Sequence, residues 1–394
     1  MNQWQELEGK YYMHLADRIP LTLVRGEGAR VWDDNGREYL DFFAGIATNS
    51  LGNCPPVVIQ AVTEQVRTLI HTSNYFYTIP QIRLAELLVR NSCLDKVFFC
   101  NSGTEANEGA IKLARRYGQK HLNGAYEVIT SLSSFHGRSL AMVAATGQEK
   151  LQKPYLPLPS GFVNVEFNNV EVIKAATTDK TCAVMLEPVQ GEGGVNVPDD
   201  DYLKLVRDWC DQKGILLILD EVQTGMGRLG TLFGYEQFGI EPDIMTLAKG
   251  LGSGVPIGAF LAKDSANVFE TGEHGSTFGG NVLTCAVAYA VLKYMLDNDV
   301  PGNARKVGQY LKDGLEGLKQ KYSFVTEVRG RGLLLAVEFN RDIGKEVMEV
   351  CLQEGMLVNR LKPNALRLMP PLIIGKDEVD KALDILSKAL SRVV

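Results

Sequence analysis

Short, continuous runs of apolar residues alternate with amphipathic stretches through the middle of the chain. Each run is bounded by turn residues, which is typical of strands buried on both faces. A helix is expected over residues 104–121, and another is expected to begin near Arg138. Alternating strands and helices indicate an α/β layered fold with a mostly parallel sheet. The predicted strands cover residues 97–100, 126–130, 162–165, 183–186, 214–219, 243–248 and 257–261.

The pattern changes after Gly280 and predicts a smaller α+β domain. We therefore expect an N-terminal arm at 1–50 that contributes to the small domain, a large domain at 51–282 and a small domain at 283–394. The elements expected in the last part are a long helical region over 283–321, strands near 324–328 and 333–339, a helix, short strands at 356–360 and 365–369, and a last helix from Lys376.

Two chemically important side chains directly follow buried runs. Residues 214–219 lead into Asp220, and residues 243–248 lead into Lys249. Because ligands bind beyond the carboxyl ends of parallel strands, we expect both side chains at one cleft. A lysine that forms a Schiff base and an acid that keeps a pyridine nitrogen protonated are what a pyridoxal-phosphate enzyme needs. The alternatives are a solvated lysine and a helix-capping acid.

The segment after the strand at 97–100 has the features of an anion site. Ser102 and Glu105 have the spacing of a capping box, which predicts the start of a helix. Gly103 lies in the turn and Thr104 adds a hydroxyl, and such a helix N-terminus can bind phosphate. An ordinary capped helix is the alternative. The position beside the same predicted sheet as Asp220 favours phosphate binding.

Composition narrows the classes of protein. The 394 residues are 45% hydrophobic and 22% charged, as in a globular protein with a sizeable core. The net charge of −6 disfavours nucleic acid or an anionic membrane as partner. Seven scattered cysteines without a CxxC pair indicate free thiols, and the five histidines form no HExxH or Cys/His cluster, so we expect no metal. Without an apolar signal segment or a run of about 18 apolar residues, a cytoplasmic protein is expected.

Seven segments resemble class III, or subgroup II, pyridoxal-phosphate aminotransferases of fold type I, and most closely the branch that acts on N-acetylornithine. They follow the expected order over nearly the whole chain. The resemblance implies a mostly parallel, seven-stranded-type sheet in the large domain, pyridoxal 5′-phosphate as cofactor and a homodimer. The segments are residues 101–106, 135–138, 187–194, 220–225, 247–250, 276–281 and 366–371.

The resemblance also implies roles for individual residues. Lys249 would hold the cofactor aldehyde and, once released by substrate, move a proton between the substrate α-carbon and the cofactor's C4′ carbon. Asp220 would pair with the pyridine nitrogen. The other implied cofactor contacts are Val222 and Phe135 on the two ring faces, Gln223 at the phenolic oxygen, Gly103 and Thr104 at the phosphate with Ser102 nearby, and Thr277 from the neighbouring subunit.

Substrate choice would depend on two arginines and one glutamate. A planar guanidinium grips a carboxylate through two parallel hydrogen bonds. By resemblance, Arg138 would hold the α-carboxylate of one substrate and the side-chain carboxylate of glutamate. Glu192 would pair with Arg367 and swing away when glutamate or 2-oxoglutarate arrives. Glu187 is expected to line the cleft, with its role open.

The preferred function is therefore transfer of the δ-amino group of N-acetylornithine to 2-oxoglutarate, giving N-acetylglutamate 5-semialdehyde and glutamate in arginine biosynthesis. The same chemistry on ornithine, succinylornithine, N-succinyl-diaminopimelate or 4-aminobutyrate is the alternative, although Ile46, where ornithine-specific members tend to carry tyrosine, favours an acylated donor. Asn53-Cys54 and Asn168-Asn169 depart from the usual family pattern.

Two readings from other classes are weaker. A catalytically silent binding protein would have little reason to keep both Lys249 and Asp220. A nicotinamide oxidoreductase would rest on residues 225–230, which match GxGxxG. No helix is predicted after that motif, and five residues separate it from the preceding strand, so it is not expected to bind a dinucleotide.

Overall fold

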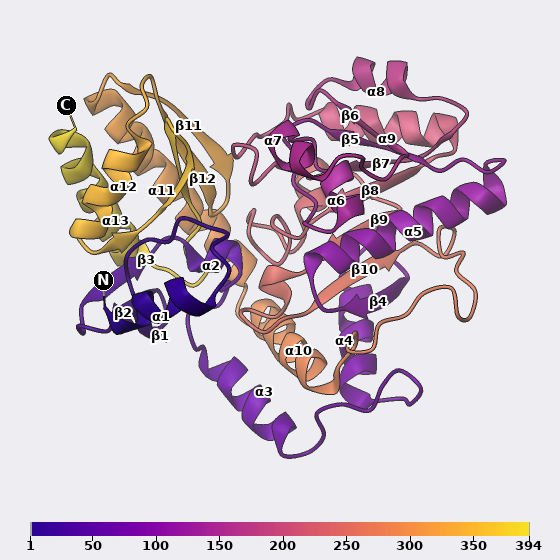
Figure 1. Cartoon of the computed structure of the whole chain (residues 1–394), viewed down its shortest axis with the longest axis horizontal. Helices are drawn as coiled ribbons and strands as arrows, with labels where there is room; N and C mark the ends of the chain where they lie inside the picture. Colours follow the sequence, from indigo (N-terminus) through magenta and orange to yellow (C-terminus); the bar gives the residue numbers. More distant parts are fainter. Residues whose placement is uncertain (1, 394) are drawn as a thin grey trace.

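A seven-stranded sheet forms the centre of the larger of two lobes (Figure 1). The computed structural model describes residues 2–393. β10 runs antiparallel to both of its neighbours, whereas the remaining pairs are parallel, which confirms the predicted mostly parallel sheet. The strand order is β4 (Lys96–Cys100), β10 (Gly258–Ala262), β9 (Ile244–Leu247), β8 (Leu216–Asp220), β7 (Thr181–Leu186), β5 (Glu127–Ser131) and β6 (Phe162–Val165).

Helices cover both faces of this sheet, so its strands are buried on both sides. In β8, Leu217 and Leu219 belong to one apolar core, whereas Leu216 and Ile218 belong to a second core that includes side chains of α5. α5 packs against β9 and β10, and α10 packs against α3 and α4. The helices of this part are α3 (Pro56–Val66), α4 (Ile79–Arg90), α5 (Gly103–His121), α6 (Leu140–Ala145), α7 (Glu149–Gln152), α8 (Val170–Ala176), α9 (Tyr202–Lys213) and α10 (Val282–Asp297).

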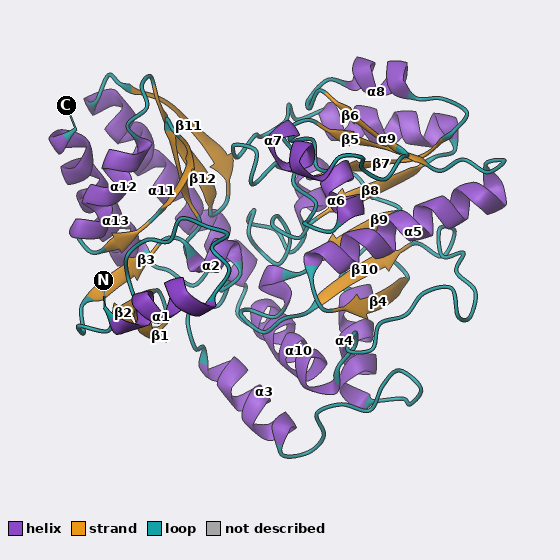
Figure 2. Ribbon diagram, viewed as in Figure 1, coloured by secondary structure: helices purple, strands orange, loops and turns teal. Residues whose placement is uncertain are grey.

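The smaller lobe contains two four-stranded sheets and both ends of the chain (Figures 1 and 2). One sheet joins the N-terminal strands β1 (Leu23–Glu27), β2 (Arg30–Asp33) and β3 (Glu38–Asp41) to β13 (Met356–Leu357). The other has the order β11 (Val325–Arg331), β12 (Leu334–Phe339), β15 (Ala365–Leu368) and β14 (Asn359–Lys362). The accompanying helices are α1 (Gln3–Tyr11), α2 (Ala44–Ala47), α11 (Val300–Lys321), α12 (Gly344–Gln353) and α13 (Lys376–Arg392).

The structure refines three of the boundaries expected from the sequence. The long helical region expected over 283–321 is present but consists of two helices, because Asp299 adopts a left-handed φ of 45° and its side chain caps Gly302 N at the start of α11. The helix expected near Arg138 begins at Leu140, after Ser139 in an extended conformation. The strand expected at 356–360 splits between the two small sheets, because β13 pairs with β3 and β14 pairs with β15.

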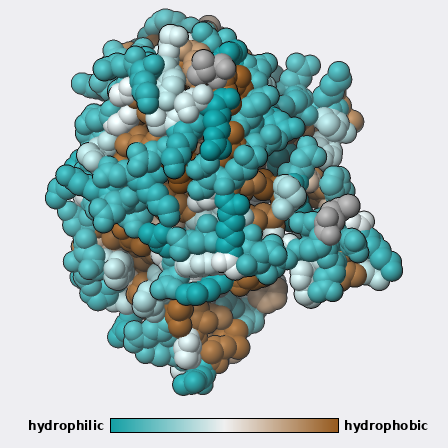
Figure 3. Space-filling model, turned by 90° about the vertical axis from the view of Figure 1, so that its left-hand side faces the viewer, coloured by the Kyte–Doolittle hydropathy of each residue, from teal (hydrophilic) through white to brown (hydrophobic). Residues whose placement is uncertain are grey.

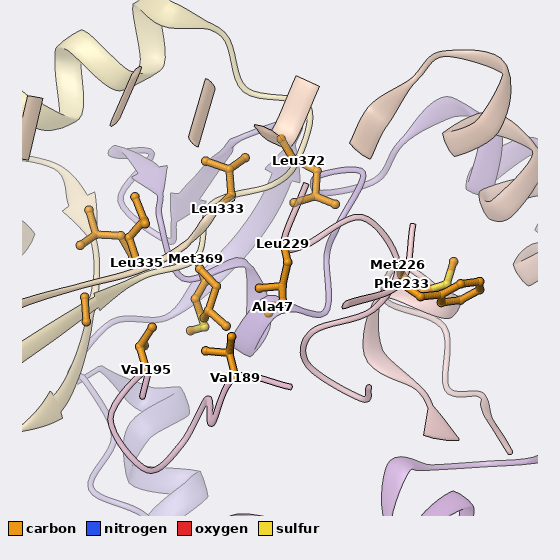
Figure 4. Close-up of a cluster of buried hydrophobic side chains, with 14 of the residues drawn as sticks. Ala47, Val189, Val195, Met226, Leu229, Phe233, Leu333, Leu335, Met369 and Leu372 are labelled. Atoms are coloured by element: carbon orange, nitrogen blue, oxygen red, sulfur yellow. The ribbon is translucent and has the colours of Figure 1, made fainter. Parts of the chain in front are cut away.

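A buried apolar cluster connects the two lobes (Figure 4). Leu229 and Phe233 come from the segment after β8, and Leu333 and Leu335 come from the start of β12. The side of the molecule formed by the smaller lobe is largely hydrophilic, and apolar side chains gather below it, at the lower end of the view (Figure 3). Among residues 2–393, the structure contains no helix that is both long enough and apolar enough to span a membrane.

Candidate active site

A cleft of about 310 Å³ lies at the carboxyl ends of the parallel strands. Asp220 is the last residue of β8, and Lys249 follows β9 after one residue. Both side chains line the cleft, together with Glu187 from the segment after β7. The parallel sheet thus brings together the acid and the lysine that the sequence places after separate strands.

The Asp220 carboxylate is buried and well supplied with hydrogen-bond donors. Asn107 Nδ2 donates to Oδ2 over 2.7 Å, and His136 Nδ1 lies 2.8 Å from the same oxygen. The Val222 N–H and the Thr246 hydroxyl donate to Oδ1 over 3.0 and 3.4 Å. No role for Asn107, His136 or Thr246 was predicted from the sequence. Together these partners fix the direction in which the carboxylate faces.

The first turn of α5 lies at the same cleft, with Ser102, Gly103 and Thr104 in its lining. Ser102 Oγ accepts a hydrogen bond from Glu105 N over 3.2 Å, so the helix begins where the capping residues predict. A side chain at Gly103 would place its Cβ 2.8 Å from Val222, which only glycine avoids. Since the N–H groups of a first helical turn carry partial positive charge, this part of the cleft suits an anion.

Lys249 has an unusual backbone and an unusual electrostatic environment. Its φ of 41° lies in the left-handed region, which non-glycine residues occupy at a cost of about 1–2 kcal/mol. Burial lowers the pKa of its amine, although the nearby Glu192 carboxylate opposes this effect. An amine with a depressed pKa is a better nucleophile and proton carrier near neutral pH.

Arg367, Glu192 and Gln223 form a connected cluster at one side of the cleft. Arg367 Nη1 lies 2.7 Å from Glu192 Oε1 and 3.2 Å from Gln223 Oε1, and Gln223 Nε2 donates to Glu192 over 3.1 Å. The side chain of Arg367 is 1% exposed, whereas that of Glu192 is 28% exposed. Burial alone would raise the pKa of Glu192, but Arg367, together with Lys249 and Gln223, outweighs burial and holds that pKa below its usual range.

Glu187 joins two backbone segments of the cleft wall. Its Oε1 accepts a hydrogen bond from Phe135 N, and its Oε2 accepts one from Gly191 N, each over 3.0 Å. Phe135 lies in the cleft lining, and Gly191 directly precedes Glu192. Burial raises the pKa of the Glu187 carboxyl to about 7, although nearby His136 opposes that shift.

Three of the expected site residues lie outside the lining of this cleft, and one of them, Arg367, is connected to it through Glu192 and Gln223. Arg138 is exposed, its guanidinium carbon lies 5.4 Å from the centre of the Phe135 ring, and its N–H donates to Thr104 Oγ1 over 3.4 Å. Thr277 is exposed and lies in the segment between β10 and α10. Arg138 directly follows Gly137, which lines the cleft, and is therefore at the cleft mouth, whereas Thr277 makes none of the contacts described for Asp220 and Lys249.

The geometry fits a flat molecule that carries a phosphate. The start of α5 supplies N–H groups and hydroxyls for the phosphate, and Asp220 supplies a fixed negative charge. Val222 and Phe135 supply apolar surface, and Lys249 supplies an amine within the same cleft. A Cβ at Gly103 would collide with Val222, so this glycine lets the start of α5 lie close to the part of the cleft wall that Val222 forms.

Comparisons with known proteins agree with this chemistry. A family model described as class-III aminotransferase matches residues 11–390. The acetylornithine aminotransferase of Caldanaerobacter subterraneus subsp. tengcongensis is 49% identical over 387 residues, which is 98% of this chain and 98% of that protein. The protein of the same name from Methanocaldococcus jannaschii is 48% identical over 392 residues, which is 99% of this chain and 98% of that protein.

Solved structures give the same result. The ornithine aminotransferase from Toxoplasma gondii ME49 matches with a TM-score of 0.96 at 34% identity, covering 99% of this chain and 94% of that chain. The acetylornithine aminotransferase from Elizabethkingia anophelis matches with a TM-score of 0.88 at 32% identity, covering 99% and 98%. On the family match and the full-length relatives, this chain belongs to the class-III aminotransferases.

Proposed function

We propose that this aminotransferase uses pyridoxal 5′-phosphate to move the δ-amino group of N-acetylornithine to 2-oxoglutarate, giving N-acetylglutamate 5-semialdehyde and glutamate. The observation that carries this proposal is the buried Arg367 paired with the half-buried Glu192 at the cleft that contains Lys249. Such a pair lets one cleft accept substrates with different numbers of carboxylates. The names of the relatives from C. subterraneus and M. jannaschii support N-acetylornithine as the donor.

Different residues of the cleft would bind different parts of the cofactor. Ser102, Gly103 and Thr104 would hold the phosphate, and Asp220 would pair with the ring nitrogen. Val222 and Phe135 would pack on the ring, and Gln223 would reach its phenolic oxygen. When bound, the cofactor supplies an electron-withdrawing ring that stabilises negative charge on the substrate carbon next to the amine.

Lys249 is proposed to do the proton chemistry. Burial lowers the pKa of its amine and so favours the uncharged form, which would remove a proton from the substrate carbon next to the amino group and deliver it to the C4′ carbon of the cofactor. Asp220 stays in place throughout, because Asn107 and His136 hold Oδ2.

The arginines are proposed to select substrates. Arg138 at the cleft mouth would hold a carboxylate of each substrate through two parallel hydrogen bonds. With N-acetylornithine, Glu192 neutralises Arg367, so the buried guanidinium keeps a partner. With glutamate or 2-oxoglutarate, the second carboxylate of the substrate would replace Glu192 on Arg367.

We also propose a homodimer in which Thr277 contributes to the neighbouring site. Thr277 is exposed in this chain, and neighbouring Phe278 exposes 60% of its surface. Mixing a Lys249→Ala chain with a Thr277→Ala chain tests this arrangement. If each site is shared, every dimer that contains one chain of each kind has one intact site, and the mixture recovers activity that neither variant has alone. No recovery would argue against a shared site.

A half-reaction panel tests the substrate. N-acetylornithine, ornithine, succinylornithine and 4-aminobutyrate are added separately to purified holoenzyme while the long-wavelength absorbance of the bound cofactor is followed. We expect N-acetylornithine to remove this absorbance fastest and 2-oxoglutarate to restore it. A faster loss with another donor would overturn the substrate but keep the reaction, whereas no such absorbance in the holoenzyme would overturn the cofactor.

Ornithine is the second candidate donor. The solved ornithine aminotransferase from T. gondii, with its TM-score of 0.96, favours this alternative. Against it, the aliphatic Ile46 lies two residues before Thr48, which lines the cleft, and offers no hydrogen bond to a free α-amino group. The ratio of the N-acetylornithine and ornithine rates in the panel decides between the two.

A further inference from the structure

A second cavity, of about 570 Å³, lies between the two lobes and away from the cleft of Lys249. Thr231 and Gln237 line it from the segment after β8, and the remaining wall comes largely from α11 and β11. Its volume is within the range of small-molecule sites, about 300–1,000 Å³. Leu229 and Leu335, which also line it, belong to the buried cluster that connects the lobes (Figure 4). The floor of this cavity is therefore firmly packed.

The charged side chains in the lining of this cavity are all basic. They are Arg305, Lys312, Arg329 and Arg331, and no aspartate or glutamate of the described chain lines the cavity. Arg329 pairs with Glu327 and Glu338, each at 2.7 Å, and Arg331 pairs with Asp200. These carboxylates lie outside the cavity and compensate only two of the four cations.

Arg305 and Lys312 have no carboxylate partner within residues 2–393. Arg305 Nη1 lies 3.5 Å from Gly230 O, and Lys312 Nζ donates to Gly330 O over 3.2 Å. The two residues are seven positions apart on α11, so they lie on one face of the helix with Cα atoms about 10 Å apart along its axis. Their positive charges are thus free to bind an anion that has two acidic groups.

Glycines shape the wall between these two cations. A Cβ at Gly308 would lie 2.2 Å from Gly332 O, so α11 lies directly against the turn between β11 and β12. Gly330 adopts a φ of 124°, a conformation that side chains rarely allow. The two glycines leave this part of the wall without side chains, whereas Gln309, between Arg305 and Lys312 on α11, also lines the cavity and adds a neutral polar group.

One cation of this cavity also contacts the loop that carries Glu192. Arg329 Nε donates to Gly194 O over 2.9 Å, and Gly194 is two residues after Glu192. The same guanidinium pairs through Nη1 with Glu327 and Glu338. An anion that binds Arg329 would compete with Gly194, Glu327 and Glu338 for its guanidinium. Such competition would change how firmly the loop of Glu192 is held.

We propose that this cavity is a second binding site, for a compact small molecule with two or more anionic groups, either phosphates or carboxylates. Arg305 and Lys312 bind the two acidic groups, and Thr231 and Gln237 add neutral hydrogen bonds. Through Arg329, the bound anion alters the freedom of Glu192 to leave Arg367. Only this last step rests on the proposed function, because anion binding itself requires no catalysis.

Calorimetric titration of the holoenzyme with pyrophosphate, and separately with citrate, tests the site and separates phosphate from carboxylate ligands. The test variant is Arg305→Gln/Lys312→Gln. The matched control is Lys306→Gln/Lys319→Gln, which removes the same charge from the same helix at positions that do not line the cavity. Equal thermal midpoints without anion establish that both variants are folded.

We expect at least one probe to bind the wild type and the control equally, and the test variant about tenfold or more weakly. Absence of binding to the wild type at about 10 mM probe, or equal binding to both variants, would overturn the site. The half-reaction rates with glutamate and with N-acetylornithine are then measured with and without the probe. We expect the bound probe to change the ratio of these two rates in the wild type and in the control, but not in the test variant. An unchanged ratio while the probe is bound would overturn the link to Glu192.

Discussion

The Glu187 carboxylate accepts hydrogen bonds from two backbone N–H groups, and its protonation state decides whether it can accept both. One oxygen accepts from Phe135 N and the other from Gly191 N. A protonated carboxyl carries a hydrogen on one oxygen, so it cannot accept both N–H groups equally well. Because burial raises the pKa of Glu187 to about 7, this change occurs near neutral pH.

Glu187→Gln should therefore lower the rate most at high pH. The amide has one acceptor oxygen, so either Phe135 or the loop of Glu192 loses its restraint, and we expect kcat to fall about tenfold at pH 8.5. The gap from the wild type should narrow as the pH falls below about 7, because the wild type then loses the same acceptor. The check is the ratio of the two kcat values from pH 6 to pH 8.5; a constant ratio would contradict this role.

Lys249 and Asp220 were predictable because each directly follows a buried apolar run, and a parallel sheet brings such ends together. The partners of Asp220 were not predictable in the same way. Asn107 and His136 lie 113 and 84 residues from it along the chain, and neither an amide nor an imidazole has a periodic sequence signature. His136 lies within residues 135–138, a segment that resembles the family, and this resemblance was the only sequence signal that it belongs to the site.

At the scale of elements, the first turn of α5 depends on a close contact with the segment after β8. The Cβ that Gly103→Ala adds would meet Val222 at 2.8 Å and crowd the phosphate end of the cleft. We expect this variant to bind the cofactor about tenfold or more weakly while staying folded, since alanine favours a helix by about 0.5–1 kcal/mol over glycine. Equilibrium dialysis of the reconstituted apoenzyme measures the affinity.

Gly317→Ala is the matched control, because nothing lies within 4 Å of a Cβ at this position of α11. It should leave cofactor affinity unchanged. A second substitution, Val222→Ala, should restore part of the affinity of the Gly103→Ala chain by removing the atoms that collide. If the double variant binds no better than Gly103→Ala alone, the contact with Val222 is not the cause of the loss.

The break between α10 and α11 illustrates what limits prediction of elements. Apolar periodicity continues across the break, because Leu296 and Val300 both pack in the same core. The helix ends for a local reason, the left-handed Asp299, whose carboxylate caps the N–H of Gly302. Pro301 in the first turn of α11 was the sequence signal, since proline is preferred at that position.

At the scale of the whole molecule, two buried glutamates make stability depend on pH. Burial raises the pKa of Glu221 to about 7 from a usual 4.5, although N–H groups of Gly234 and Tyr235 oppose the shift. Glu187 is raised in the same way. The folded chain therefore binds more protons than the unfolded chain between about pH 4.5 and 7, so stability falls as the pH rises through this window.

Glu221→Gln should reduce this dependence. Glu221 contributes at most about 3 kcal/mol of the loss between these pH values, from about 1.4 kcal/mol per unit of pKa. Urea unfolding of the wild type and the variant at pH 5 and pH 7.5 measures the difference. Glu316→Gln, at a position whose side chain is 40% exposed, serves as control and should keep the wild-type slope; the same slope in Glu221→Gln would contradict the assignment.

The division into domains remains a prediction. Residues 1–50 supply strands to a sheet with β13, and we propose boundaries near 50 and 282. Pairing between β3 and β13 joins residues more than 300 positions apart, for example Leu40 with Met356. No local pattern in the sequence predicts such a pair, because a strand as short as β13 gives no clear periodicity.

Arg228 connects the two segments that hold the substrate-selecting cluster. It is buried, and its Nη1 donates to Leu333 O over 3.1 Å and to Pro370 O over 2.6 Å. It follows Gln223 by five residues, and Pro370 follows Arg367 by three. No carboxylate pairs with it among the residues that the structure describes, so its hydrogen bonds must offset the cost of burying a charge.

The cost of burying the charge of Arg228 and the gain from its hydrogen bonds are of similar size. The variant Arg228→Met, which removes both, is therefore informative. Methionine keeps much of the volume and removes the buried charge, but leaves two carbonyls without a donor at about 1–3 kcal/mol each. We expect the free energy of unfolding to change by less than about 2 kcal/mol, whereas the half-reaction with glutamate slows, because Gln223 and Arg367 lose their common restraint. Arg228→Ala also loses packing and should be less stable by about 2–4 kcal/mol. Equal destabilisation of both variants would mean that the hydrogen bonds, not the volume, make Arg228 stabilising.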